Sequence, residues 1–283
     1  MRSYAIADVF CDVPLEGNPV AVFTDGEGLA DEVMQRAARE LNLSETVFVL
    51  EADGDRDADA RVRIFTPAVE LPFAGHPVLG TAFVLGQLSG LDVVRLRTGA
   101  GIVPIALRRE GDTVVYGEME QPIPTWSRFA AESELLAALG VERSGLPVEI
   151  YDNGSRHTYV ELSDEDEVAA VTPDMRALAA VGTVGASCFA VLPRGARVKT
   201  RMFGPGLGVP EDPATGSAAG PLTVHLARHG RIAFGETVEI HQGAEIGRPS
   251  VLRASAEGSA ESLTRVVVGG GAVIVARGEY RLG

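Results

Sequence analysis

The sequence predicts an α+β protein made of two pseudo-symmetric half-domains, each a barrel-like β-sheet around a central α-helix. Three observations support this prediction: the chain repeats itself at about half its length, short β-rich runs alternate with turn residues, and each copy contains a helix that is apolar on all sides. At 283 residues and 46% hydrophobic content, the chain is long enough for two such units, each with its own core.

The repeat has an offset near half the chain length. Arg63–Pro67 (RIFTP) recurs as Arg201–Pro205 (RMFGP), an offset of 138, and Ala74–His76 recurs as Thr215–Ser217, an offset of 141. The matches are weak individually but occur in the same order, which indicates two copies of one unit. We place the half-domains at residues 1–122 and 123–283, and we leave open whether the last strand returns to the first half.

The first copy begins with alternating strands and turns. The expected strands are Tyr4–Val9, Val20–Phe23, Thr46–Leu50 and Arg61–Phe65. A helix over Asp31–Asn42 would place Val33, Ala37, Ala38 and Leu41 on its buried stripe. The acidic loop at 53–59 resembles a calcium loop, but Ala58 replaces the required turn glycine and Ile64 the required bidentate glutamate. We therefore interpret it as a solvated hairpin loop.

A helix follows the Phe-x-Pro segment in each copy. The expected helices, His76–Leu88 and Ser217–Arg228, each follow a glycine and begin with apolar or small residues on all sides, the pattern of a helix enclosed by sheet. Two such units side by side would bring both helix N-termini to one cleft. Unpaired N–H groups and the helix dipoles make such a place suitable for a carboxylate or another anion.

The composition excludes several classes of partner. With 39 acidic and 25 basic residues, the formal charge of −14 opposes binding to a phosphate backbone or an anionic membrane. No apolar run approaches membrane-spanning length and the N-terminus lacks the features of a signal peptide, so we expect a cytoplasmic protein bound to neither nucleic acid nor membrane. Cys11 and Cys188 lack any metal-binding spacing and are expected to be small core side chains.

No motif in the sequence requires a cofactor or a metal. His225 and His229 have the i, i+4 spacing of a zinc-binding helix, but Leu226 occupies the place of the usual glutamate and no third ligand is evident. We interpret them as histidines placed near a helix C-terminus, where the dipole favours them. The glycines at 204–208 and 99–101 lack the full dinucleotide fingerprint and are interpreted as turns.

Four polar residues fall at the predicted junction of the two copies. They are Glu45, His76, Asp212 and Ser217. Taken singly, Glu45 could be a solvent-facing strand end, and Asp212 and Ser217 could be helix caps. The repeat changes this balance for Glu45, because its counterpart is Ala186 and the scaffold itself therefore does not require a carboxylate there.

Several segments resemble the PhzF family of phenazine-biosynthesis-like isomerases, which share the diaminopimelate-epimerase fold. These segments are Asn42–Phe48, Phe65–Pro77 and Glu211–Gly220, with Gly17–Pro19, Gln242–Gly243, Gly247–Ser250 and Val268–Gly270, so the resemblance covers essentially the whole chain. It implies that Glu45 matches the catalytic glutamate of the family and that His76, Asp212, Gly75, Gly216 and Ser217 match its surroundings. Asn18 in Gly17–Pro19 is expected to bind substrate.

The resemblance also bears on the reaction. Epimerases and racemases of this fold carry a cysteine at each helix start, whereas this chain has none there. A single carboxylate that moves a proton on one face of the substrate gives isomerisation, provided that burial raises its pKa. We therefore expect a cofactor-independent, homodimeric isomerase acting on a small, cyclic carboxylate such as trans-2,3-dihydro-3-hydroxyanthranilate. Epimerisation by Glu45 with His76, and a binding protein without turnover, stay open as alternatives.

Overall fold

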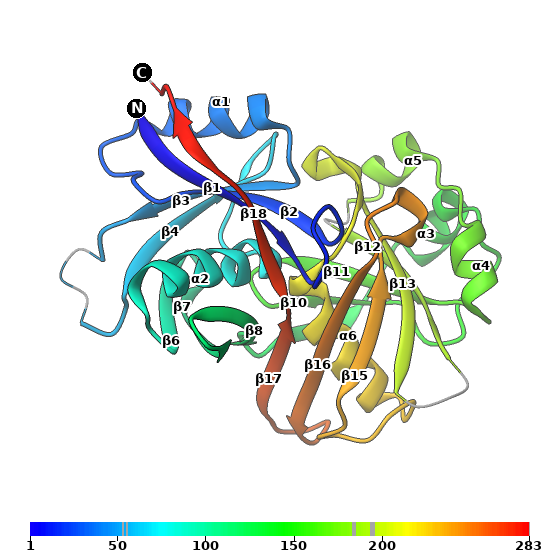
Figure 1. Ribbon diagram of the computed structural model, residues 1–283. Coiled ribbons are helices and arrows are strands. Elements are labelled where there is room, and N and C mark those ends of the chain that lie inside the picture. The colour runs from blue at the N-terminus through cyan, green and yellow to red at the C-terminus, as the bar shows by residue number, and fades with distance from the viewer. Residues whose placement is uncertain (53, 55, 183–184, 193–195, 283) are drawn as a thin grey trace.

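The computed structural model describes residues 1–52, 54, 56–182, 185–192 and 196–282. Its strands join one continuous sheet that curls around two helices, α2 and α6 (Figure 1). The first part of the chain forms β1 (Arg2–Val9), β2 (Asn18–Phe23), α1 (Asp31–Leu41), β3 (Glu45–Leu50), β4 (Ala60–Phe65), β5 (Glu70–Leu71), α2 (Gly75–Ser89), β6 (Val93–Thr98), β7 (Gly101–Glu110) and β8 (Thr113–Glu120).

The second part carries the same kinds of element with extra surface helices. It forms β9 (Thr125–Arg128), α3 (Glu132–Leu139), β10 (Glu149–Asp152), β11 (Arg156–Glu161), α4 (Glu165–Ala170), α5 (Met175–Ala180), β12 (Gly185–Val191), β13 (Arg197–Gly204), η1 (Pro205–Leu207), β14 (Val209–Asp212), α6 (Gly216–Arg228), β15 (Val238–Gln242), η2 (Ala244–Ile246), β16 (Ser250–Gly258), β17 (Leu263–Gly270) and β18 (Ala272–Tyr280).

The strand order repeats between the two copies. In the first copy β2-β3-β4-β6-β7-β8 are neighbours, with β2 parallel to β3, β4 parallel to β6 and the other pairs antiparallel. The second copy repeats this order and these directions in β11-β12-β13-β15-β16-β17. Strands β8 and β17 join the copies, and β18 pairs with β1. The predicted duplication is confirmed, whereas the boundary at residue 122 stays a prediction.

The helices and strands predicted from periodicity are confirmed within a residue or two. The α1 helix differs from the prediction: its buried side chains are Met34, Ala37 and Ala38, whereas Val33 and Leu41 are only partly buried. The β3 and β4 strands pair antiparallel, as the hairpin prediction requires. Of the acidic loop between them, residues 53 and 55 lie outside the described part of the chain.

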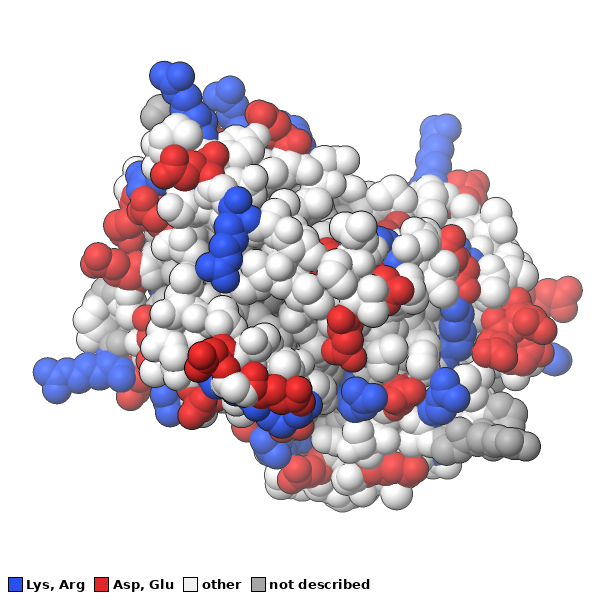
Figure 2. All heavy atoms as spheres, viewed as in Figure 1, with Lys and Arg blue, Asp and Glu red and all other residues white. Residues whose placement is uncertain are grey.

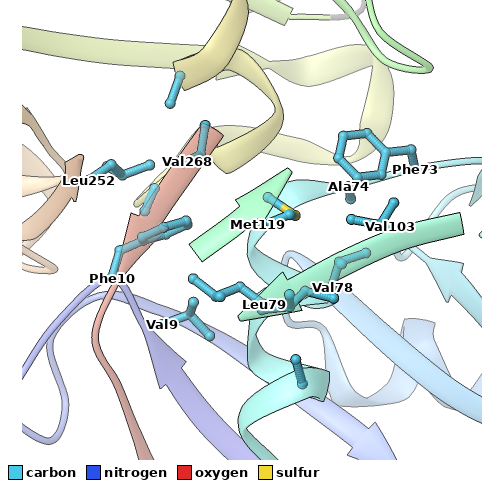
Figure 3. Close-up of a cluster of buried hydrophobic side chains, with 14 of the residues drawn as sticks. Val9, Phe10, Phe73, Ala74, Val78, Leu79, Val103, Met119, Leu252 and Val268 are labelled. Atoms are coloured by element: carbon cyan, nitrogen blue, oxygen red, sulfur yellow. The ribbon is translucent and has the colours of Figure 1, made fainter. Parts of the chain in front are cut away.

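The core lies between the central helices and the inner face of the sheet. Helix α2 packs against β1, β2, β6 and β8, and α6 packs against β11, β16 and β17. Figure 3 shows Val78 and Leu79 of α2 among Val9, Val103 and Met119 from the surrounding strands, and all five side chains are fully buried. This all-round burial explains why the two helix sequences lack a polar face.

Helices α2 and α6 meet at their N-termini. A Cβ atom added to Gly75 would fall 2.4 Å from the backbone of Gly216 and Ser217, and one added to Gly216 would fall 3.0 Å from the backbone of Gly75 and His76. The two helix starts are therefore in backbone contact, which only glycine permits. This contact brings both predicted helix starts to one place.

The surface carries mixed charge. On the face shown in Figure 2, Lys and Arg side chains are interspersed with Asp and Glu side chains and do not gather into one basic patch. No helix among the described residues is both long and apolar enough to cross a membrane. Cys11 and Cys188 are buried and unpaired, which confirms their predicted place in the core.

Replacing Gly75 with Ala should destabilise the protein and reduce its activity. The added methyl group must displace the α6 backbone, and overpacking of this kind typically costs about 1–3 kcal/mol of unfolding free energy. Gly206→Ala is the matched control, because a Cβ there meets nothing within 4 Å. Thermal unfolding of both variants checks this, and equal melting temperatures would contradict the close contact.

Candidate active site

A small, partly open cavity lies where the two helix starts meet. Its volume is about 30 Å³, enough for one or two water molecules. Side chains and backbone from both copies line it: Glu45, Leu71, Ala74, Gly75, His76, Ser155, His157, Met202, Leu207, Val209, Asp212, Thr215, Gly216 and Ser217. The structure therefore brings together six of the seven site residues expected from sequence.

Glu45 and His76 face each other inside this cavity. Glu45 Oε2 lies 3.2 Å from His76 Nε2, and neither atom has a hydrogen-bond partner among the described residues. Burial, together with the negative charge of Asp212, raises the pKa of Glu45 well above its usual range. Burial lowers the pKa of His76 to about 3, so this imidazole is neutral near neutral pH.

The proton of neutral His76 can be placed on Nδ1. A backbone hydrogen bond to Pro19 opposes the fall in the pKa of His76, and because proline has only a carbonyl to offer, the imidazole must donate. Nε2 makes no hydrogen bond, so Nδ1 is the donor. The bare Nε2 lone pair is therefore turned toward Glu45, where it can accept a hydrogen bond.

Asn18 joins the two copies behind the cavity. Its amide nitrogen donates to Asp212 Oδ1 at 2.8 Å and to the Ala214 carbonyl at 2.9 Å, and it lies 3.1 Å from His76 Nδ1. Two hydrogens are fully used by the first two acceptors, so the third contact adds no hydrogen bond. Asn18 is not among the residues that line the cavity, so its expected role in binding substrate stays a prediction.

Asp212 is held by several donors and still has a raised pKa. Thr215 Oγ1 donates to its Oδ2 at 2.7 Å, and Gln242 holds both the Asp212 carbonyl and Thr215 Oγ1. Burial raises the pKa of Asp212 to about 6, although hydrogen bonds from Thr215, Asn18 and Ser44 lower it. The cavity thus contains two acidic groups whose pKa values are raised above their usual range, as expected for groups with acid–base roles.

The helix starts offer unused donors to the same cavity. Neither Ala74 nor Thr215, the residues that precede α2 and α6, caps its helix with a side chain. The Thr215 hydroxyl donates to Asp212 instead. Because the first N–H groups of a helix have no partner within it, the backbone of both helices can bind an anion where they meet.

Three polar residues of the cavity, Ser155, His157 and Thr215, were not predicted as site residues from the sequence. His157 lies on β11 with Nε2 3.1 Å from Ser217 Oγ, and Ser155 donates to the Phe73 carbonyl at 2.6 Å. Strand pairing supplies the signal that could have identified His157. In the first copy Val20 pairs with Glu45, and in the second copy Thr158 pairs with Ala186, the counterpart of Glu45. Val20 and Thr158 are therefore counterparts at the repeat offset of 138. The residues directly before them, Pro19 and His157, are counterparts at the same offset.

The histidines at the end of α6 lie outside this cavity. His225 Nδ1 and His229 Nε2 lie 3.2 and 3.0 Å from Glu149 Oε2, a neighbour that the sequence did not reveal. Arg228 Nη1 lies 2.7 Å from the same oxygen. His225 lies in the last turn of α6, as expected, and burial lowers its pKa. The group is a network of donors around one partly buried carboxylate, that of Glu149.

Comparison with known proteins identifies the family of the chain. The sequence profile described as "Phenazine biosynthesis-like protein" (PhzC-PhzF) matches residues 7–278. A trans-2,3-dihydro-3-hydroxyanthranilate isomerase from Pseudomonas fluorescens is 52% identical over 278 residues, which cover 98% of this chain and 99% of that protein. The corresponding isomerase from Pseudomonas aeruginosa is 51% identical over all of both chains.

Solved structures agree on the fold. A structure described as a predicted epimerase from Pseudomonas aeruginosa is 32% identical with a TM-score of 0.83, covering 100% of both chains. A probable proline racemase from Agrobacterium radiobacter shares only the fold, at 12% identity and a TM-score of 0.70, covering 100% of this chain and 94% of its own. With its profile match, its relatives and its diaminopimelate-epimerase-like fold in agreement, the chain belongs to the PhzF family of phenazine biosynthesis-like proteins.

Proposed function

We propose that the protein isomerises trans-2,3-dihydro-3-hydroxyanthranilate, or a closely similar small cyclic carboxylate, by moving a proton with Glu45. The observation that carries this proposal is the Glu45 carboxyl, which is buried in a cavity between two helix starts and has a raised pKa. The full-length identity of 52% to an isomerase of this name supports the substrate. Homodimerisation and a cytoplasmic location are kept as predictions from the sequence.

The proposed reaction is a proton shift with no net loss of atoms. Ionised Glu45 takes a proton from one ring carbon, the electron pair moves into the ring's double bonds, and the same carboxylic acid returns the proton to another carbon on the same face. A pKa near the working pH suits a group that must both accept and release a proton. The bare Nε2 of His76, 3.2 Å away, can accept a hydrogen bond from the protonated Glu45 carboxyl during the shift.

The substrate carboxylate is expected to lie against the helix starts. The N–H groups of the first turns of α2 and α6, with their positive dipole ends, would offset its charge. The cavity of about 30 Å³ is smaller than a six-membered ring with its carboxylate, so its walls must separate to admit substrate. Their return would exclude water and strengthen the electrostatic interactions of the site.

A thiol mechanism is disfavoured by the two cysteines themselves. Neither residue lines the cavity. Burial raises the pKa of each thiol to about 12, so neither is a thiolate near neutral pH. The proton must therefore move through the carboxyl and imidazole groups.

Glu45→Gln should reduce turnover by about 10³ or more while leaving a folded protein that binds ligand, because the variant keeps the shape and loses the base. In D₂O, the wild-type enzyme should place deuterium on the carbon that receives the proton, and the variant should show neither exchange nor product. Glu134→Gln, at an exposed carboxylate, is the control. Turnover of Glu45→Gln within a few-fold of wild type would show that Glu45 is only a carboxylate at the end of a strand and not the proton carrier.

Asp212→Asn and His76→Ala should each reduce turnover by about 10² or more. Asp212→Asn should also move the acidic limb of the kcat/KM profile to lower pH, because the charge of Asp212 is one cause of the raised pKa of Glu45. Asp112→Asn, at an exposed loop, should leave both rate and profile unchanged. An unmoved limb in Asp212→Asn would show that the two carboxyl groups do not interact.

Glu45→Gln should also raise the melting temperature near pH 8. The usual pKa of a glutamate is 4.5, and in the folded protein it is higher. Between these values the folded state keeps a proton that the unfolded state loses, so stability falls as pH rises and stays lowered above the folded pKa. The neutral glutamine removes this penalty, and the difference from wild type should disappear as pH approaches 4.5. Calorimetry over this pH range provides the test.

A further inference from the structure

The Ser217 hydroxyl at the start of α6 has one protein partner, the imidazole of His157. His157 is 2% exposed and Ser217 is 5% exposed, and both line the cavity with Glu45 and His76. The distance from His157 Nε2 to Ser217 Oγ is 3.1 Å. No other partner of this hydroxyl is found among the described residues, so its orientation depends on the protonation of one ring.

The second ring nitrogen of His157 decides where its proton is. Nδ1 is buried and has no hydrogen-bond partner in the described part of the chain. The backbone of Gly185 lies close to it, since a Cβ added there would fall 2.7 Å from Nδ1. Burial also lowers the pKa of His157 to about 4, so the ring carries a single N–H near neutral pH.

The two neutral tautomers of the His157 ring differ in free energy. A proton on Nδ1 would leave a buried N–H without an acceptor, and such orphaned donors are rarer in native proteins than orphaned lone pairs. A proton on Nε2 satisfies the donor and leaves only a lone pair unused. In that tautomer Nε2–H donates to Ser217 Oγ, and the hydroxyl hydrogen of Ser217 is free to point into the cavity.

The repeat provides independent support for this role. Ser217 is the counterpart of His76 at an offset of 141, and His157 is the counterpart of Pro19 at an offset of 138. In the first copy the Pro19 carbonyl accepts from His76, which turns the free nitrogen of His76 toward the cavity as an acceptor. In the second copy His157 stands at the position that corresponds to Pro19. There the His157 ring donates to Ser217, whereas the Pro19 carbonyl accepts from His76.

We propose that His157 is a positioning residue that fixes Ser217 as a hydrogen-bond donor toward an anionic oxygen of the substrate. The site then has an acceptor at His76 and a donor at Ser217, on the two helix starts. It would favour ligands with a carboxylate or enolate oxygen facing α6 over neutral analogues with a donor there. This inference rests on the proposed function for the nature of the ligand, but not on Glu45 as the proton carrier.

The tautomer can be measured directly in the wild-type protein. Long-range ¹H–¹⁵N spectra of histidine-labelled protein distinguish the two tautomers, and His157→Gln identifies the signals of His157 by their absence. We expect the proton on Nε2. A proton on Nδ1 would overturn the proposal, because Ser217 would then donate to the ring and present only lone pairs to the ligand.

A double-mutant cycle tests the consequence for binding. With anthranilate as the probe, His157→Phe and Ser217→Ala should each weaken binding about 10-fold, and the double variant should be little weaker than either, because both remove one interaction. His157→Gln keeps a donor near the position of Nε2 and should bind within a few-fold of wild type. His241→Phe, a partly exposed histidine outside the cavity, is the control.

The selectivity for anthranilate over its neutral amide, 2-aminobenzamide, should fall in His157→Phe and persist in His157→Gln. Additive effects in the cycle, or unchanged selectivity, would refute the role of His157. If His157→Phe fails to fold, the tautomer and the Gln variant still decide the matter. Failure of the wild-type protein to bind anthranilate would count against the proposed substrate class instead, and active Glu45→Gln would count against the proposed base alone.

Discussion

The backbone contact between Gly75 and Gly216 is the constraint on which the rest of the site depends. Two helices that start in contact must turn their first N–H groups toward the same small volume, and any side chain at either position would separate them. The sheet of each copy closes around its own helix, so the positions of the strands follow from those of the helices. Glu45, on β3 of the first copy, reaches the cavity only because of this arrangement.

Within that volume, burial shifts the pKa values of the acid–base groups. Burial lowers the pKa of His76 and raises those of Glu45 and Asp212, so each group moves toward its neutral form. The same burial that makes the carboxyl groups useful as acids and bases also destabilises the folded state once they ionise. Asn18 and Gln242 compensate in part by satisfying the remaining acceptors across the junction.

The sequence predicted those features that depend on local pattern. The apolar stretches after Gly75 and Gly216 identified the central helices, and the offset between the copies identified where they would meet. Features that depend on side chains from distant parts of the chain were not predicted: His157, Ser155 and Glu149 reach their partners across the sheet. Periodicity reports which face of an element is buried, but not which distant side chain lies opposite.

The pairing of β1 with β18 places the two ends of the chain side by side (Figure 1), from Arg2 against Tyr280 to Val9 against Ala272. During synthesis, β1 leaves the ribosome well before β18, because the whole second copy lies between them. The first copy therefore cannot complete its sheet while the chain is growing, whereas β9 to β17 can pair as soon as they emerge. Until then β1 presents an unpaired strand edge, which is the kind of surface that chaperones protect from aggregation.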